Sequence, residues 1–147
     1  MDKQEINNAI TEHAIWKYSL NNIIRTGKLE TSIEGYKECA FGKWFYGPTI
    51  LAGEKSSMHF KKVEELHIEL HEIAAKIANL ASNGEKEEAE KLLGFEGEFD
   101  TTSCRLIEAM MKWKNDSTCR DCQLEERKVP SCCESQGKVQ NASVPVK

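Results

Sequence analysis

The sequence contains no long apolar run and almost no strand signal, and these absences narrow the classes of protein that it encodes. A helix that spans a membrane needs about 20 mostly apolar residues, so no membrane insertion is expected. The N-terminus, MDKQEINN, lacks the basic start and apolar core of a secretory signal, which predicts a cytoplasmic protein. Basic and acidic residues are interspersed at a net charge of −4, so no nucleic-acid surface or polybasic membrane patch is expected.

Residue patterns that carry chemistry are also few. The sequence shows no Ser-His-Asp or phosphate-loop pattern, and it contains only four histidines. Its six cysteines are many for a cytoplasmic chain, where cysteines more often bind metals or react than form disulfides. Two of them, Cys39 and Cys104, fall in the regular part of the chain. The other four crowd near its end: Cys119, Cys122, Cys132 and Cys133.

Apolar residues recur every three or four positions along much of the chain, which is the spacing of one helix face. This spacing predicts long helices over residues 6–26, 57–80 and 99–114, and a short helix over residues 85–93. A Gly-punctuated aromatic segment between the first two long helices allows another short helix over residues 35–46. Helices of this length joined by short links predict an all-α fold, an antiparallel four-helix-type bundle with an additional short helix.

The composition divides the chain into two regions. Residues 1–114 carry the helical pattern and are expected to form the bundle. Residues 115–147 contain two prolines, four cysteines and few bulky apolar residues, so they are expected to form a flexible tail. The tail cysteines allow three interpretations: a second metal site built from thiolates, a redox-active segment, or no defined role.

The placement of three histidines and one cysteine suggests a metal site. His67 and His71 are one helical turn apart, so both imidazoles project from one face of a helix. His13 lies on the apolar stripe of the first predicted helix, and Cys39 lies in the segment that connects the two helices. Together they would form a tetrahedral shell of three nitrogens and one thiolate, a ligand set that zinc accepts. The pattern alone equally allows core histidines, a surface histidine pair and a buried apolar cysteine.

Several short motifs resemble one known family. They are residues 13–17 (HAIWK) on the first predicted helix, residues 39–44 (CAFGKW) followed by Tyr46-Gly47, the His67–His71 pair preceded by Phe60 and Leu66, and residues 98–103 (EFDTTS). The most specific of these is the string CAFGKW, which stands in order between the histidines. The chain resembles the chemoreceptor zinc-binding domain family over about residues 6–114.

The resemblance implies a helical bundle with one zinc ion held by His13, Cys39, His67 and His71. Members of this family are usually attached to chemotaxis receptors or diguanylate cyclases, report zinc or oxidant, and are often homodimers. No receptor coiled coil or cyclase segment accompanies the motifs here, so a separate signalling protein is the expected partner.

A site with four protein ligands predicts sensing rather than catalysis. Catalytic zinc normally keeps an open position for water, so no catalytic residue and no enzymatic activity are expected. Zinc occupancy would couple to packing, and oxidation of Cys39 would remove the only anionic ligand. The remaining charge of about +1 favours nearby carboxylates, for which the candidates are Glu12, Glu64, Glu69 and Glu72.

Three other functions compete with a zinc or oxidant sensor. The first is zinc storage or delivery, in which the cysteine-rich tail passes metal to or from the bundle. The second is a hemerythrin-like oxygen carrier with two irons, which needs more histidines than this chain has. The third is a metal-free adaptor bundle.

Overall fold

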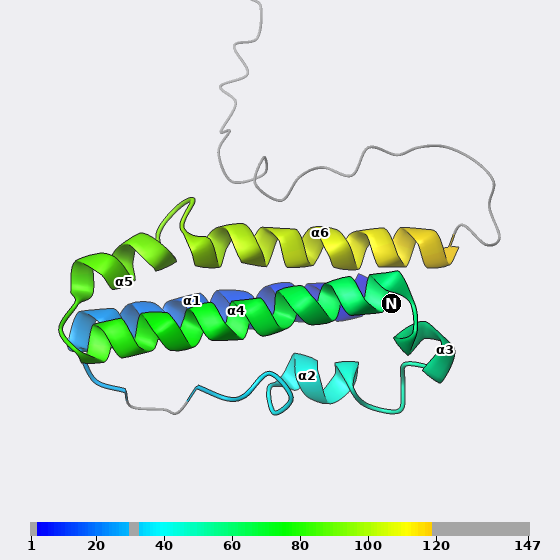
Figure 1. Cartoon of the computed structure of the whole chain (residues 1–147), viewed down its shortest axis with the longest axis horizontal. Helices are drawn as coiled ribbons and strands as arrows, with labels where there is room; N and C mark the ends of the chain where they lie inside the picture. The colour runs from blue at the N-terminus through cyan, green and yellow to red at the C-terminus, as the bar shows by residue number, and fades with distance from the viewer. Residues whose placement is uncertain (1–2, 30–32, 119–147) are drawn as a thin grey trace, which may run out of the picture.

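The computed structural model describes residues 3–29 and 33–118, and every regular element in that part of the chain is an α-helix (Figure 1). The elements are α1 (Lys3–Thr26), α2 (Ala40–Phe45), α3 (Ala52–Lys55), α4 (Met58–Ser82), α5 (Lys86–Leu93) and α6 (Glu98–Thr118). The all-α fold expected from the sequence is therefore confirmed. Among these helices, none combines the length and the hydropathy that a membrane crossing requires.

Three long helices, α1, α4 and α6, form the body of the bundle, and each of them contacts the other two. The helix α4 is buried along the predicted stripe, with its apolar side chains at intervals of three and four. Its fully buried members include Val63, Leu70, Ala74 and Ile77. The core is thus a seam along α4 that α1 and α6 cover.

The helices α1 and α4 run in the same direction, while α6 runs opposite to both (Figure 1). Gly27, which follows α1, lies near the Ala81 carbonyl at the end of α4, so the two helices finish together. A chain that leaves α1 must therefore travel back along the bundle before α4 begins. The segment between α1 and α4, called the return path below, contains α2 and α3. It takes the place of the second long helix of an up-and-down bundle.

The return path differs from the sequence prediction in two details. The predicted helix over residues 35–46 is shorter, because a turn precedes it and Cys39 caps α2 at its first residue. The single-turn helix α3 had no periodic signal. At the other end, α6 continues to Thr118, past the predicted boundary at residue 114, and the tail cysteines lie outside the described residues.

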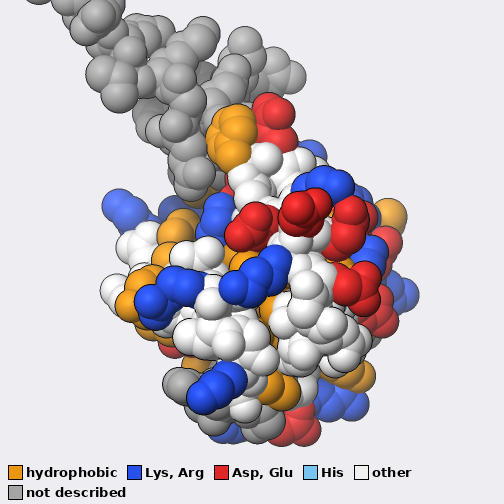
Figure 2. Space-filling model, turned by 90° about the vertical axis from the view of Figure 1, so that its left-hand side faces the viewer, with side chains coloured by type: hydrophobic (Ala, Val, Ile, Leu, Met, Phe, Trp, Pro, Cys, Tyr) orange, Lys and Arg blue, Asp and Glu red, His pale blue; other side chains and the backbone are white. Residues whose placement is uncertain are grey.

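Charged side chains of both signs lie on the end of the bundle that carries α5. Figure 2 shows the end of the bundle that carries α5, where acidic and basic groups alternate and hydrophobic side chains form only small separate patches. The interspersed charges expected from the sequence are therefore visible on this face.

Candidate metal centre

The structure brings one sulfur and two imidazole nitrogens into a single cluster. The Sγ atom of Cys39 lies 3.4 Å from Nε2 of His67, which lies 3.1 Å from Nε2 of His71. All three ligand atoms are within 4.8 Å of one another. Tetrahedral zinc holds its nitrogen and sulfur ligands roughly 3.3–3.8 Å apart, so small side-chain shifts suffice to close a shell.

The two histidines are placed by the regular geometry of α4. Ser57 caps this helix by accepting a hydrogen bond from the Phe60 amide, and the residues that follow run uninterrupted through both histidines. Because the spacing is four residues, the two rings lie on one face of the helix, where they meet edge to face with centroids 4.7 Å apart. His67 is 2% exposed and His71 is 8% exposed, so both face the interior.

Cys39 is placed by the turn that starts α2. Its Sγ accepts a hydrogen bond from the Gly42 amide at 3.2 Å, as the side chain of an N-cap residue does, and it also contacts the Tyr36 carbonyl at 3.6 Å. These two bonds fix the side chain of Cys39 on the side of α2 that faces α4. The sulfur therefore reaches His67 even though Cys39 itself lies in an irregular segment.

The return path also orients His71. Its Nδ1 donates a hydrogen bond to the Glu34 carbonyl at 3.0 Å. Because a carbonyl oxygen only accepts, the proton of the ring sits on Nδ1 and the Nε2 lone pair is available to a metal. A carbonyl behind a histidine ligand is the arrangement commonly found at metal sites.

His13 lines the same cavity but stands apart from the three clustered ligand atoms. It is 9% exposed, and its Nδ1 lies 3.1 Å from the Ser103 hydroxyl. The structure therefore brings together Cys39, His67 and His71, and it places His13 on the wall beside them. The complete set of four ligands stays a prediction.

The cavity has a size and a lining that suit an ion. Its volume is about 40 Å³, whereas sites for organic ligands measure roughly 300–1,000 Å³. Trp16 packs edge-on against His71 with ring centroids 4.2 Å apart, and Phe41 packs against His67 at 4.6 Å. These apolar rings lower the local polarity around the two histidines, which strengthens electrostatic attraction between a cation and its ligands.

Burial keeps the three imidazoles neutral. Burial lowers the pKa of His13 and of His71 to about 4 and the pKa of His67 to about 3. Repulsion from His71 lowers the pKa of His13 and of His67 further. The Glu34 carbonyl and Glu38 oppose the shift at His71. The neutral imidazole is the form that binds a metal, so the site needs no deprotonation of histidine at neutral pH.

The thiol of Cys39 behaves in the opposite way. Burial raises its pKa, the Gly42 amide opposes this shift, and the carboxylates of Glu34 and Glu12 add to it. The side chain is consequently a protonated thiol at neutral pH, and a bound cation would convert it to the thiolate. The atom of His67 that faces Cys39 and His71 is Nε2, so one sulfur and two imidazole nitrogens converge as a donor set that zinc accepts. Nδ1 of His67 is buried and has no hydrogen-bond partner among the described residues.

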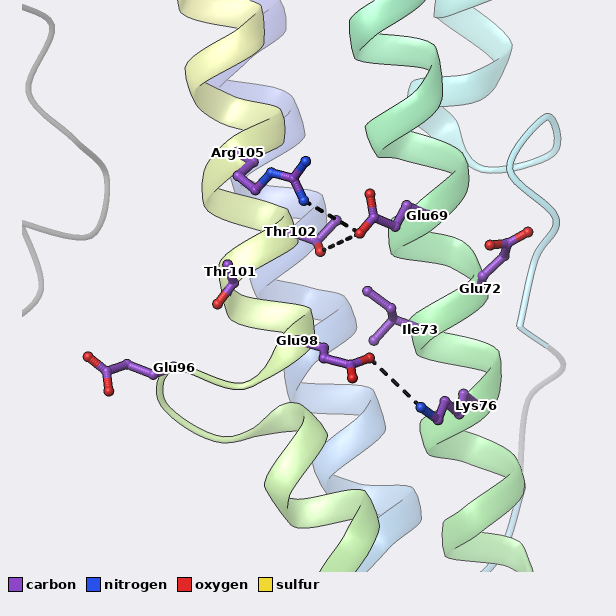
Figure 3. Close-up of a pocket in the computed structure, with 9 residues that line it drawn as sticks. All are labelled: Glu69, Glu72, Ile73, Lys76, Glu96, Glu98, Thr101, Thr102 and Arg105. Atoms are coloured by element: carbon purple, nitrogen blue, oxygen red, sulfur yellow. Dashed lines mark hydrogen bonds and ion pairs between the residues drawn. The ribbon is translucent and has the colours of Figure 1, made fainter.

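The carboxylates around the cavity differ in part from those named from the sequence. Glu12 lines the cavity, as does Glu34, for which the irregular return path gave no signal. Glu64 instead accepts a hydrogen bond from the Tyr46 hydroxyl at 3.0 Å. Glu69 turns away toward Thr102 and Arg105 on α6, beside a hollow that shares no lining residue with the metal cavity (Figure 3). The same hollow is lined by Glu72.

Comparison with known proteins agrees with this geometry. A helical bundle that gathers a cysteine and two histidines around a small cavity has the features of a metal-binding module. Residues 13–78 match the chemoreceptor zinc-binding domain (CZB) family, a domain that binds zinc, and the Cys39, His67 and His71 cluster lies within this segment. The matched segment includes all four predicted ligands, and the family is a sensory module rather than a catalytic one. Comparisons with curated proteins and with solved structures gave no match.

Gly42 offers a test of the turn that delivers Cys39. A Cβ atom at this position would collide with the Tyr36 carbonyl, and that backbone belongs to the turn that carries the sulfur. Gly42→Ala is therefore expected to displace Cys39 and to weaken zinc binding at least about tenfold, with a stability cost of about 1–3 kcal/mol. Competition with a chromophoric chelator measures the affinity.

Gly53 supplies the matched control for this substitution. It lies in α3, and a Cβ there meets nothing within 4 Å. Gly53→Ala should leave zinc affinity unchanged. Equal affinities for both variants would mean that the turn does not position the sulfur.

Proposed function

We propose that this protein is a regulatory sensor of zinc or of oxidants, built on a site of His13, Cys39, His67 and His71. The observation that carries the proposal is the convergence of a half-buried cysteine sulfur with imidazole nitrogens from a different element. Cys39 and His67 are far apart in sequence, so only the folded bundle unites them. A metal held there links the return path to α4.

Zinc availability is one input that this arrangement supports. Metal ligands from separate elements make occupancy part of the folding free energy, so the return path would be held more tightly when zinc is bound. With His13 as the fourth ligand, α1 would be tied to the same ion. A closed shell of four protein ligands leaves no position for an activated water, which supports sensing rather than catalysis.

Oxidant is the second input. A bound zinc ion would displace the proton of Cys39 and hold the side chain as a thiolate, which is the form that reacts with peroxide. In that reaction the sulfur loses two electrons and becomes a sulfenic acid, while hydrogen peroxide is reduced to water. The product is a poorer ligand without the negative charge, so zinc release and a shift of the Cys39 turn would follow.

The output of the sensor is proposed to be a protein contact. We propose a homodimer and a signalling partner, and a cytoplasmic location where thiols stay reduced. Large apolar side chains exposed on the described surface support such a contact, among them Tyr18 at 69% and Phe95 at 70%. Sedimentation velocity with and without zinc tests the dimer.

Metal analysis tests the proposal directly. The purified protein is expected to contain about one zinc per chain. Treatment with hypochlorite or peroxide is expected to release it, because oxidation of Cys39 removes the only anionic ligand. A metal-sensitive dye follows the release, and mass spectrometry identifies the oxidised residue. Zinc that stays bound after Cys39 is oxidised would exclude the oxidant input, while a protein that binds no zinc would refute the whole proposal.

A further inference from the structure

A serine on α6 contacts the histidine that the three-atom cluster leaves out. The hydroxyl of Ser103 lies 3.1 Å from Nδ1 of His13, although the two residues belong to opposite ends of the described chain. His13 is buried, and Ser103 is half-buried. The contact joins α6, which lies beyond the matched segment 13–78, to the wall of the metal cavity.

The antiparallel packing of α1 and α6 fixes this contact in register. One turn further along α1, Lys17 forms an ion pair with Asp100 at 3.0 Å, and Asp100 lies one turn before Ser103 on α6. The Asp100 side chain is only 18% exposed, so the pair is partly screened from solvent. Polar contacts thus join two successive turns of α1 to α6, and they fix Ser103 opposite His13.

The chemistry of histidine ligation gives the contact a role. An imidazole that binds zinc through Nε2 carries its proton on Nδ1, and a buried N–H needs an acceptor. The Ser103 oxygen is in place to accept that bond, as the Glu34 carbonyl does for His71. Such partners orient the ring and raise the basicity of the ligating nitrogen, and losing one typically costs about 10–100-fold in metal affinity.

We propose that Ser103 is a positioning residue for His13, which holds the ring with Nε2 toward the metal cavity and makes α6 the fourth element of the zinc site. This inference rests on the proposed four-ligand site. It adds a role for α6, because a change in zinc coordination at His13 would reach that helix through a direct hydrogen bond.

The first experiment measures zinc affinity by chelator competition in Ser103→Ala, with His13→Ala and the double variant alongside. Ser103→Ala is expected to weaken zinc binding about tenfold, and to have no further effect when His13 is already absent. Thr101→Ala is the matched control, because Thr101 is exposed on the same helix and points away from Glu69 (Figure 3). Far-ultraviolet circular dichroism confirms that each variant is folded.

The outcomes separate this inference from the proposed function. If His13→Ala binds zinc as tightly as the unchanged chain, His13 is no ligand and the four-ligand site fails. If His13→Ala binds weakly but Ser103→Ala does not, only the role of Ser103 fails. Equal losses from Ser103→Ala with and without His13 would also overturn it, because the serine would then act through general stability.

A second measurement uses the unchanged chain and does not depend on any variant folding. Nitrogen-15 spectra of the zinc-loaded protein report which ring nitrogen of each histidine carries the proton. For His13 the proton is expected on Nδ1, with Nε2 bound to the metal. A proton on Nε2, with Nδ1 bound to the metal, would refute the proposal because Ser103 could not then hold Nδ1.

Discussion

Replacing Cys39 by alanine is expected to weaken zinc binding by about 100- to 1,000-fold while the helices remain in place. A structural zinc site contributes about 10–16 kcal/mol, or about 2.5–4 kcal/mol for each of four ligands, and every 1.4 kcal/mol is about a factor of ten. The loss of binding free energy for Cys39 lies at the upper end of this range, because the thiolate is the only anionic ligand of the four. The helices should persist because the seam of α4 is buried independently of the sulfur.

The same substitution changes the number of protons that zinc releases. In the metal-free protein the pKa of Cys39 is raised by burial, while those of the three histidines are lowered. At pH 7 zinc therefore displaces about one proton, which comes from the thiol. Calorimetry in buffers of different ionisation enthalpy should give about one proton for the unchanged chain and none for Cys39→Ala.

Cys104 provides a control on the same chain. It lies on α6 and does not belong to the cluster, so Cys104→Ala should keep both the affinity and the proton count. Unchanged affinity in Cys39→Ala would refute its role as a ligand. Complete loss of helix in that variant would instead indicate a metal whose role is purely structural.

The metal-free protein is expected to lose stability as soon as the pH falls below the pKa of an ordinary histidine, about 6.5. The folded pKa values of His13, His67 and His71 lie at about 4, 3 and 4, below the value of 6.5 for an unperturbed histidine. Below pH 6.5 the unfolded chain binds protons that the folded chain does not. Stability is therefore intact above about pH 6.5 and is lost as the pH falls toward about 4.

The size of this effect is set by the number of histidines. Each fully linked proton changes the free energy of unfolding by about 1.4 kcal/mol per pH unit, so His13 and His67 together contribute about 3 kcal/mol per unit, and His71 acts in the same direction. A domain at the low end of ordinary stability, about 5 kcal/mol, would therefore unfold near pH 5. Urea titrations followed by circular dichroism between pH 7 and pH 4.5 measure the slope.

Variants assign the slope to the buried histidines. His13→Gln should lower the number of protons taken up on unfolding by about one. A free energy of unfolding that stays constant from pH 7 to pH 5 would contradict neutral, buried imidazoles in the folded protein.

Local patterns were enough to predict the helices and the two histidines that share one. The apolar stripe of α4 fixes which face is buried, and the four-residue spacing of His67 and His71 then places both rings on that face. The histidine His13 was likewise predicted to face inward from the stripe of α1, and it is buried there. These predictions succeeded because helix geometry relates sequence spacing to direction.

The position of Cys39 could not be predicted in the same way. It lies in a return path with no periodicity, where the direction of a side chain depends on turns and caps. Its contact with His67 follows from the Gly42 amide and from the length of chain needed to return beneath α1 and α4. The Glu34 carbonyl behind His71 had no signal at all, because every residue has such a carbonyl.

The sequence by itself thus determined the helical class, the buried faces, the family and the types of ligand that suit zinc. Only the tertiary structure decided which atoms meet: the sulfur beside His67, the carbonyl behind His71 and the hydroxyl behind His13. The physical reason is that residue spacing sets directions within one helix, whereas contacts between elements depend on the path of the connecting chain and on how the helices pack.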